Sequence, residues 1–315
     1  MLNTNHHKRI ALFAIILGAW CLGSSPIFVR LGEAGPSAIA FWRVALSLPI
    51  AYAWMRMENR LNYDYFNKNN NTYSSNIFRA NIANKKLLII LIASFFWVGD
   101  LIFWHLSLSK TNIANSTFLA TSSPIFITIA AWFLFGEKYT RLFLLGAGIT
   151  VVGSIVLMSA TLNFDNGSIV GDGLSLITAF CFGAFVLAVR QLRKFMGAGT
   201  IMFYTALISA PCFLIISILS GEIFFPNSLQ GWGALLGLAI ITQILGQGLL
   251  AYGLGQIKAG AASILILIEP IVAALLAWLV LSEALNPLQA AGCLLIILGI
   301  IVVQKQSSAY DSQAN

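Results

Sequence analysis

The sequence has 315 residues, of which 58% are hydrophobic and 9% are charged. This composition excludes an ordinary soluble domain, in which about a quarter of the residues carry a charge. It predicts an integral membrane protein, so the formal net charge of +7 is expected to lie in loops beside the bilayer.

Ten apolar stretches follow one another along the chain, each close to the ~20 residues that a helix needs to cross a bilayer. They are 11–29, 36–57, 87–108, 112–135, 141–160, 171–190, 200–220, 229–254, 259–281 and 287–303. None shows the alternation typical of transmembrane strands. The expected fold class is therefore an all-α integral membrane protein with ten transmembrane helices.

Lys and Arg residues are distributed unevenly between the two sides of this bundle. With the N-terminus in the cytoplasm, most of them lie in inner loops and tails, whereas Arg30 and Lys110 lie on the opposite side. This bias follows the positive-inside rule and predicts that both termini are cytoplasmic. It also argues against nucleic acid as a partner.

The two halves of the chain repeat each other at a constant spacing. From residue 108 to 156 the counterpart of each residue lies 146 positions later, as in Pro124/Pro270, Trp132/Trp278, Glu137/Glu283 and Gly153/Gly299. Each half holds five spans, an odd number, so the second half must enter the membrane from the opposite side. The sequence thus predicts two inverted repeats, an organisation that places a transporter's substrate site near the bilayer midplane.

These repeats define the expected domains. The first five-helix repeat occupies 8–160 and the second occupies 171–304, followed by a cytoplasmic tail at 305–315. The first repeat carries an Asn-rich cytoplasmic loop at 58–86, whose composition predicts poor order.

Four ionisable residues lie inside predicted spans and are functional candidates, because a charge in lipid is costly: Arg43, Asp100, His105 and Glu269. Glu269 precedes Pro270, and its repeat counterpart Ser123 precedes Pro124. Two proline-interrupted helices related by the repeat are where a transporter site is expected. A carboxylate there could exchange a proton or bind an ammonium group, although a kinked helix with a hydrogen-bonded Glu is an equal alternative. Ser122 belongs to the same motif.

Arg43 and Asp100 are predicted at similar depths below one membrane surface and could form an ion pair. Such a pair could be structural, act as a gate or bind a substrate carboxylate. Trp97, Asp100 and Trp104 share one helical face, which suits either an amine-bearing ligand or aromatic packing.

Other polar residues in the spans are weaker candidates. His105 lies near a helix end and is more typical of an interfacial residue than of a proton relay. Gln243 and Gln247 share a face of the eighth span, where they could line the site or join helices. No metal or cofactor is predicted.

The chain resembles the EamA-type transporters of the drug/metabolite transporter superfamily. The resemblance rests on the two five-span repeats, on Trp20 in the first span, on Phe41-Trp42-Arg43 opening the second, and on the paired segments 124–137 and 270–283. It implies a ten-helix carrier of the bacterial inner membrane that moves small metabolites, often amino acids, usually outward and in exchange for protons or another solute. Asp100 and His105 lie outside the family's pattern.

The favoured hypothesis is a secondary transporter of an amino acid or related amine that works by alternating access as a monomer or homodimer. Its expected partners are the bilayer and a small-molecule substrate, with protons as the candidate coupling ion. Arg43 could meet a carboxylate while Asp100 or Glu269 meets an ammonium group. A multidrug exporter on the same scaffold is the alternative. An enzyme or sensor is disfavoured, since HExxH and GxSxG motifs and a soluble output domain are absent from the sequence.

Overall fold

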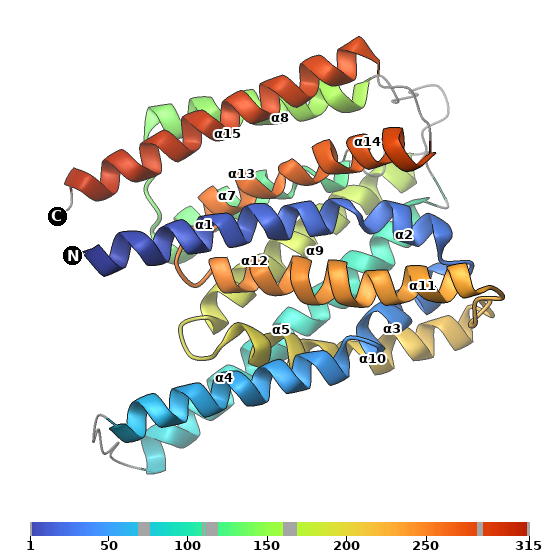
Figure 1. Cartoon of the computed structure of the whole chain (residues 1–315), viewed down its shortest axis with the longest axis horizontal. Coiled ribbons are helices and arrows are strands. Elements are labelled where there is room, and N and C mark those ends of the chain that lie inside the picture. Colours follow the sequence, from blue (N-terminus) through green and yellow to red (C-terminus); the bar gives the residue numbers. More distant parts are fainter. Residues whose placement is uncertain are drawn as a thin grey trace.

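The computed structural model describes residues 2–68, 76–108, 110, 119–159, 169–281 and 286–313. Within these ranges the regular structure is helical and no strand occurs. The helices run roughly along one direction and form a single bundle, with the N- and C-termini at the same end (Figure 1).

The elements follow the two halves of the chain. The first half contains α1 (Leu2–Gly23), α2 (Ser25–Leu31), α3 (Pro36–Ala45), α4 (Leu48–Lys68), α5 (Asn76–Leu108), α7 (Ser123–Phe135) and α8 (Arg141–Ser159). The second half contains α9 (Ile169–Leu192), α10 (Ala198–Leu219), α11 (Leu229–Gly237), the π-helix η2 (Leu238–Gln247), α12 (Gly248–Gly253), α13 (Ala259–Ile266), α14 (Ile268–Leu281) and α15 (Pro287–Gln313).

Eight segments of the described chain are long and apolar enough to cross a membrane: Lys8–Leu31, Pro36–Leu61, Asn84–Trp104, Ile169–Leu192, Ala198–Leu219, Leu229–Gly253, Ala259–Val280 and Pro287–Gln304. Two shorter apolar helices, Ser123–Phe135 and Arg141–Leu157, lie inside the predicted spans 112–135 and 141–160. Large apolar side chains such as Phe13, Phe133 and Leu219 are exposed on the bundle surface. Exposed apolar surface of this kind suits contact with lipid, so the helices are those of a multi-pass membrane protein.

Much of the segment 58–86, which the sequence analysis predicted to be a loop, is helical in the structure. Helix α4 continues to Lys68 and α5 begins at Asn76, while 69–75 lies outside the described residues. Asn disfavours a helix by less than about 1 kcal/mol relative to Ala, so a helix anchored in the bundle can continue through Asn-rich sequence. The junction 161–168 between the repeats also lies outside the described residues.

Three apolar helical segments are interrupted two or three residues before a proline. The breaks lie at Ser24, Ser122 and Leu267, and the prolines are Pro26, Pro124 and Pro270. At the first break the Ser24 hydroxyl donates to the Cys21 carbonyl (2.6 Å). At the second the Ser122 hydroxyl donates to the Leu119 carbonyl (2.7 Å). Serine hydroxyls thus bond to backbone carbonyls at interruptions where water is scarce.

Glu58 and Glu222 connect two neighbouring segments, α3–α4 and α10, in a reciprocal way: each segment supplies a carboxylate to a helix start of the other. Glu58 in the middle of α4 accepts from the Thr200 amide at the start of α10 (3.3 Å). Glu222 beyond the end of α10 accepts from the amides of Ser37 (2.8 Å) and Ala38 (3.0 Å) at the start of α3. The first amides of a helix lack partners within it and carry partial positive charge, so each carboxylate stabilises a helix start.

Helices α8 and α15 pack closely along the outside of the bundle (Figure 1). Glycines allow this approach: a Cβ on Gly146 would lie 3.0 Å from the Gly299 carbonyl oxygen, and one on Gly153 would lie 2.6 Å from the Ile296 nitrogen. Small residues of this kind let backbones in membranes approach and gain van der Waals contact.

We expect Gly153→Leu to lower the thermal unfolding temperature of the detergent-purified protein, because overpacking typically costs about 1–3 kcal/mol. Gly148→Leu on the same helix is the matched control, since nothing lies within 4 Å of a Cβ at that position. Equal unfolding temperatures for the two variants would contradict a close contact at Gly153.

Candidate functional site

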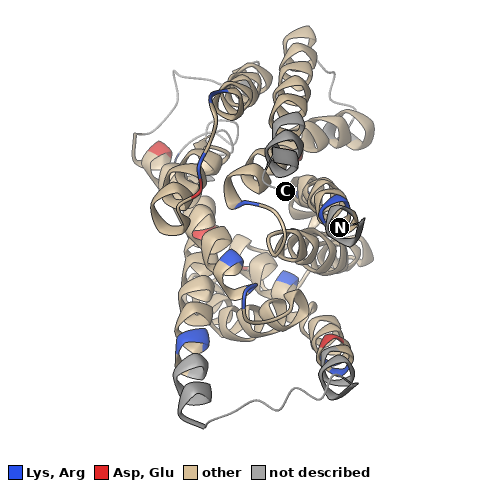
Figure 2. Cartoon of the chain, turned by 90° about the vertical axis from the view of Figure 1, so that its left-hand side faces the viewer, with Lys and Arg blue, Asp and Glu red and all other residues tan. Residues whose placement is uncertain are grey.

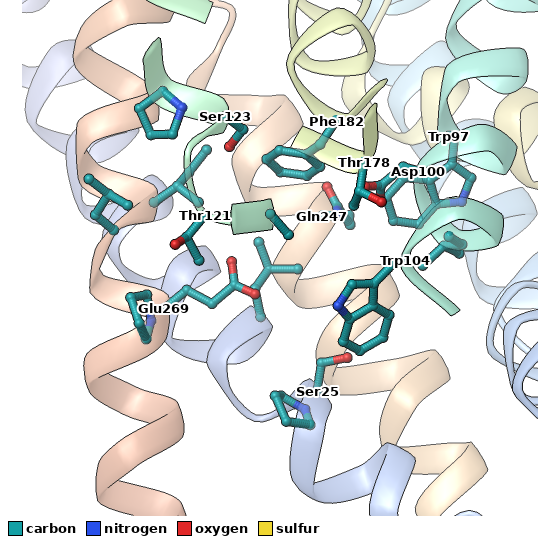
Figure 3. Close-up of a pocket in the computed structure, with 18 of the residues that line it drawn as sticks. Ser25, Trp97, Asp100, Trp104, Thr121, Ser123, Thr178, Phe182, Gln247 and Glu269 are labelled. Carbon is teal, nitrogen blue, oxygen red and sulfur yellow. The ribbon is translucent and has the colours of Figure 1, made fainter. Parts of the chain in front are cut away.

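A cavity of about 150 Å³ lies where the interrupted helices meet. Nine of the residues that the sequence analysis singled out line it: Arg43, Trp97, Asp100, Trp104, Ser123, Pro124, Gln247, Glu269 and Pro270. They come from both halves of the chain. Glu269 and Asp100 approach the cavity from opposite sides, with Gln247 between them (Figure 3).

Arg43 supplies the positive charge of the cavity. Its side chain is 7% exposed, and its Nε donates to Gln243 Oε1 at 2.9 Å. The guanidinium also lies 5.3 Å from the centre of the Trp97 ring. The charges that act on it are those of Asp100 and Glu269. Because a buried charge is costly unless it is compensated, these groups form one electrostatic unit.

The cavity contains two carboxyl groups and one guanidinium. Asp100 is 8% exposed and Glu269 is partly buried. If both carboxyl groups are ionised, one negative charge remains uncompensated by Arg43. The site can then balance that charge with a proton or with a cationic group of a ligand.

Aromatic rings form part of the wall. Trp97 is 2% exposed and packs against Phe185, with ring centres 4.9 Å apart. Its indole Nε1 is buried and has no hydrogen-bond partner among the described residues. Trp104 and Phe182 also line the cavity, and rings beside carboxylates favour an amine-bearing ligand.

The helix breaks place backbone ends at the cavity. Ser123 is 4% exposed and begins α7, directly before Pro124, and Glu269 lies in the first turn of α14, directly before Pro270. The start of a helix carries partial positive charge, so these two starts can attract the anionic part of a ligand.

Several predicted site residues lie elsewhere. Gln243 holds Arg43 rather than lining the cavity, and both Gln243 and Gln247 belong to η2. The Ser122 hydroxyl is bonded to the backbone. Trp20 is 50% exposed and outside the cavity lining. The side chain of His105 lies outside the described residues.

The sequence analysis missed some cavity residues. Ser25 and Pro26 line the cavity at the break between α1 and α2, and their Ser-Pro dipeptide repeats the signal of Ser123-Pro124. Thr178 and Phe182 line it from α9. Their i, i+4 spacing predicts a shared helical face, but no feature of the sequence distinguishes this face from an ordinary packing face.

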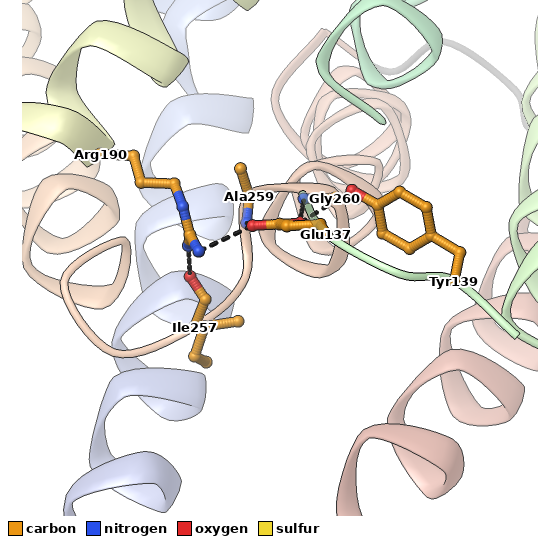
Figure 4. A network of polar contacts seen from close by, with 6 residues as sticks. All are labelled: Glu137, Tyr139, Arg190, Ile257, Ala259 and Gly260. Carbon is orange, nitrogen blue, oxygen red and sulfur yellow. Dashed lines mark hydrogen bonds and ion pairs between the residues drawn. The ribbon is translucent and has the colours of Figure 1, made fainter. Parts of the chain in front are cut away.

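A second polar cluster joins three helices at the end of the bundle that holds the termini (Figure 4). Glu137 follows α7 and is 5% exposed. Its carboxylate lies 2.7 Å from an Arg190 nitrogen and accepts from the amides of Ala259 (3.0 Å) and Gly260 (3.3 Å) at the start of α13. The Tyr139 hydroxyl donates to it at 2.8 Å. We call this cluster the Glu137 latch.

The latch has two further features. Arg190 also donates to the Ile257 carbonyl before α13, so both partners of the ion pair hold the same helix start. Burial, followed by the hydrogen bond to the Glu137 carboxylate, raises the pKa of the Tyr139 phenol. Tyr139 therefore remains a neutral hydrogen-bond donor at higher pH than a solvated tyrosine.

A bundle of membrane-crossing helices with proline breaks around a charged cavity has the architecture of a membrane transporter. The comparison with known families agrees: the model of the EamA-like transporter family matches residues 9–159 and again 169–304. The chain belongs to the EamA-like transporter family and is a multi-pass membrane protein.

Relatives differ in how much of the chain they cover. A probable amino-acid metabolite efflux pump of Salmonella typhimurium is 30% identical over 194 residues, which are 58% of this chain and 65% of that protein, just under two thirds of its length. The pseudopaline exporter of Pseudomonas aeruginosa is 24% identical over 65% of this chain and 70% of its own. An uncharacterized transporter of Archaeoglobus fulgidus is 24% identical over 95% and 97%.

One crystal structure has a similar fold. It superposes with a TM-score of 0.70 at 17% sequence identity and covers 95% of this chain and 98% of its own. At this identity the likeness concerns the fold alone.

We expect Glu137→Ala to destabilise the purified protein by about 3–5 kcal/mol, because it leaves Arg190 without its ion-pair partner and the start of α13 without its cap. Thermal unfolding in detergent measures the effect. Lys138→Ala is the control, since its side chain is exposed. A Glu137→Ala protein that unfolds at the wild-type temperature would show that the latch contributes no stability.

Proposed function

We propose that this protein is a secondary transporter that exports a small zwitterion or amine, such as an amino acid or a derivative of one, by alternating access. The observation that carries the proposal is the cavity in which Arg43 faces two carboxyl groups, Asp100 and Glu269. A substrate carboxylate would bind Arg43, and its ammonium group would bind one of the acids. The name of the Salmonella relative supports efflux of amino-acid metabolites, and the name of the Pseudomonas relative supports export as the direction.

The size of the cavity supports a small substrate. An apolar cavity of about 150 Å³ in another protein holds a molecule the size of benzene. The cavity described here has a similar volume, which suits a metabolite better than the bulky compounds of a multidrug exporter. The multidrug alternative draws its support from the aromatic wall of Trp97, Trp104 and Phe182, since flexible apolar contacts serve unrelated ligands.

Protons are the proposed coupling ion. Glu269 would release its proton when the substrate ammonium arrives and take one up when the ammonium leaves, so one site would alternate between the two cations. Such exchange needs no second binding site, because charge compensation at the carboxylate is conserved in both states.

The proposed topology has ten membrane-spanning helices in two inverted repeats, with both termini in the cytoplasm of a bacterium and the chain in its inner (plasma) membrane. Three observations support it. Glu58 and Glu222 make reciprocal contacts, and the family model matches the chain twice. Gly146 approaches Gly299 and Gly153 approaches Gly292, a crossed pair of contacts between glycines that the repeat matches as 146/292 and 153/299. Lys and Arg positions lie around the end that holds the termini (Figure 2), as expected for a cytoplasmic face.

Alternating access would use the helix breaks as hinges and the Glu137 latch as a cytoplasmic closure. The latch ties the end of α7 and the end of α9 to the start of α13. Opening the cavity towards the cytoplasm would require these contacts to separate. Pro124 and Pro270 lie beside the cavity, where small changes in backbone angle would move the helix ends.

The test is transport of a pool of labelled amino acids by proteoliposomes, with and without a pH gradient. We expect gradient-dependent transport of one or a few compounds. Glu269→Gln and Asp100→Asn should each reduce it at least about tenfold, since loss of a buried charge contact costs about 2 kcal/mol or more. Asp172→Asn is the control, because Asp172 lies in the first turn of α9 and not in the cavity lining.

Unchanged transport by both acid variants would refute the proposed roles of these groups. Transport of structurally unrelated drugs, with no amino acid or amine moved, would favour the multidrug alternative on the same scaffold.

A further inference from the structure

A groove lies on the surface of the bundle, between α5 and α7 and over α9. Its volume is about 710 Å³, and it shares no lining residue with the charged cavity. Along α9 its lining extends from Phe180 to Leu187 and on to Lys194 just beyond the helix, a length of about 20 Å at 1.5 Å per residue. One leaflet of the hydrocarbon core is about 15 Å thick, so the groove is long enough to hold an acyl chain that spans one leaflet.

The groove is apolar and open at its rim. Its base on α9 contains the small residues Gly183, Ala184 and Ala188, and the rim includes Phe180 and Leu134, which are 51% and 68% exposed. Because small residues form its base and large exposed residues form its rim, the groove can admit a linear alkyl chain. In a bilayer, acyl chains are the apolar groups that surround such a groove.

The lining is polar at one end. Gln191 and Lys194 lie there, at the end of the bundle that also holds the Glu137 latch. The Lys194 nitrogen lies 5.2 Å from the centre of the Phe135 ring, and the Arg190 guanidinium lies 5.4 Å from the same centre. Arg190 is paired with Glu137, so Lys194 supplies the net positive charge at this end.

The buried Oε1 of Gln191 has no hydrogen-bond partner among the described residues. A buried acceptor without a partner is costly, and this one lines the groove beside Lys194. The polar end thus offers a cation and an acceptor at one end of an apolar groove.

We propose that this groove binds one anionic phospholipid, with an acyl chain between α5 and α7, its phosphate on Lys194 and a headgroup or glycerol hydroxyl donating to Gln191. Basic pockets between membrane helices are suited to such headgroups. A phospholipid satisfies the apolar groove, the cation and the acceptor together. A second copy of the chain would cover the apolar wall but would bring no anion that the structure assigns to Lys194.

The test is native mass spectrometry of the full-length protein in neutral detergent, with phosphatidylglycerol or phosphatidylcholine added. The wild type should retain phosphatidylglycerol in preference to phosphatidylcholine. Lys194→Gln should lower phosphatidylglycerol retention about fivefold, as expected for one basic residue near an anionic headgroup, and leave phosphatidylcholine unchanged. Lys138→Gln, an exposed lysine in the loop after α7, should have no effect.

Ala130→Trp tests the apolar part of the groove separately, because the larger side chain would fill it. This variant should lower retention of both lipids. Ile129→Trp is its control, because Ile129 is 52% exposed and outside the groove lining. Equal effects of the two lysine variants would overturn the proposal, as would unchanged retention by Ala130→Trp. A shift of Ala130→Trp from dimer to monomer without loss of lipid would instead identify a second copy as the occupant.

Discussion

The capping of helix starts by acids from other helices is the interaction on which this bundle depends. Glu58, Glu137 and Glu222 each accept from backbone amides at the start of a helix distant in sequence. Such amides lack intrahelical partners, and a membrane protein has little water to replace them. Each carboxylate satisfies the amides and opposes the helix dipole in one contact. These three contacts join helix starts to segments that are distant in sequence.

The cavity is a consequence of that arrangement. Continuous helices pack without leaving room for charges, whereas the breaks before Pro26, Pro124 and Pro270 turn backbone ends towards one point. Arg43, Asp100 and Glu269 converge there from three different segments, and no pair of them is adjacent in sequence. A buried cation shared by two acids is stable only while every member is compensated. A substrate or proton that alters the balance would therefore act on all the segments that carry the charges.

Helix α9 contributes residues to the Glu137 latch, to the cavity and to the groove. On α9, Arg190 faces the latch, Thr178 and Phe182 face the cavity, and Ala184 and Ala188 form the base of the groove. A shift of α9 would therefore change the cavity, the Glu137 latch and the groove together. This shared helix gives a physical route by which the surrounding lipid could influence transport.

The sequence alone determined the membrane class, the approximate limits of most helices and nine of the residues around the cavity, because apolar runs, prolines and isolated charges in lipid are local features with large energies. It predicted the family from paired motifs, which the family match confirms. Tertiary structure decided that Arg43 binds Gln243, that Trp20 lies outside the cavity and that Glu137 caps α13. The two hydrogen-bonded contacts join residues more than 100 positions apart. These contacts and the position of Trp20 depend on how the helices pack, which no local pattern in the chain encodes.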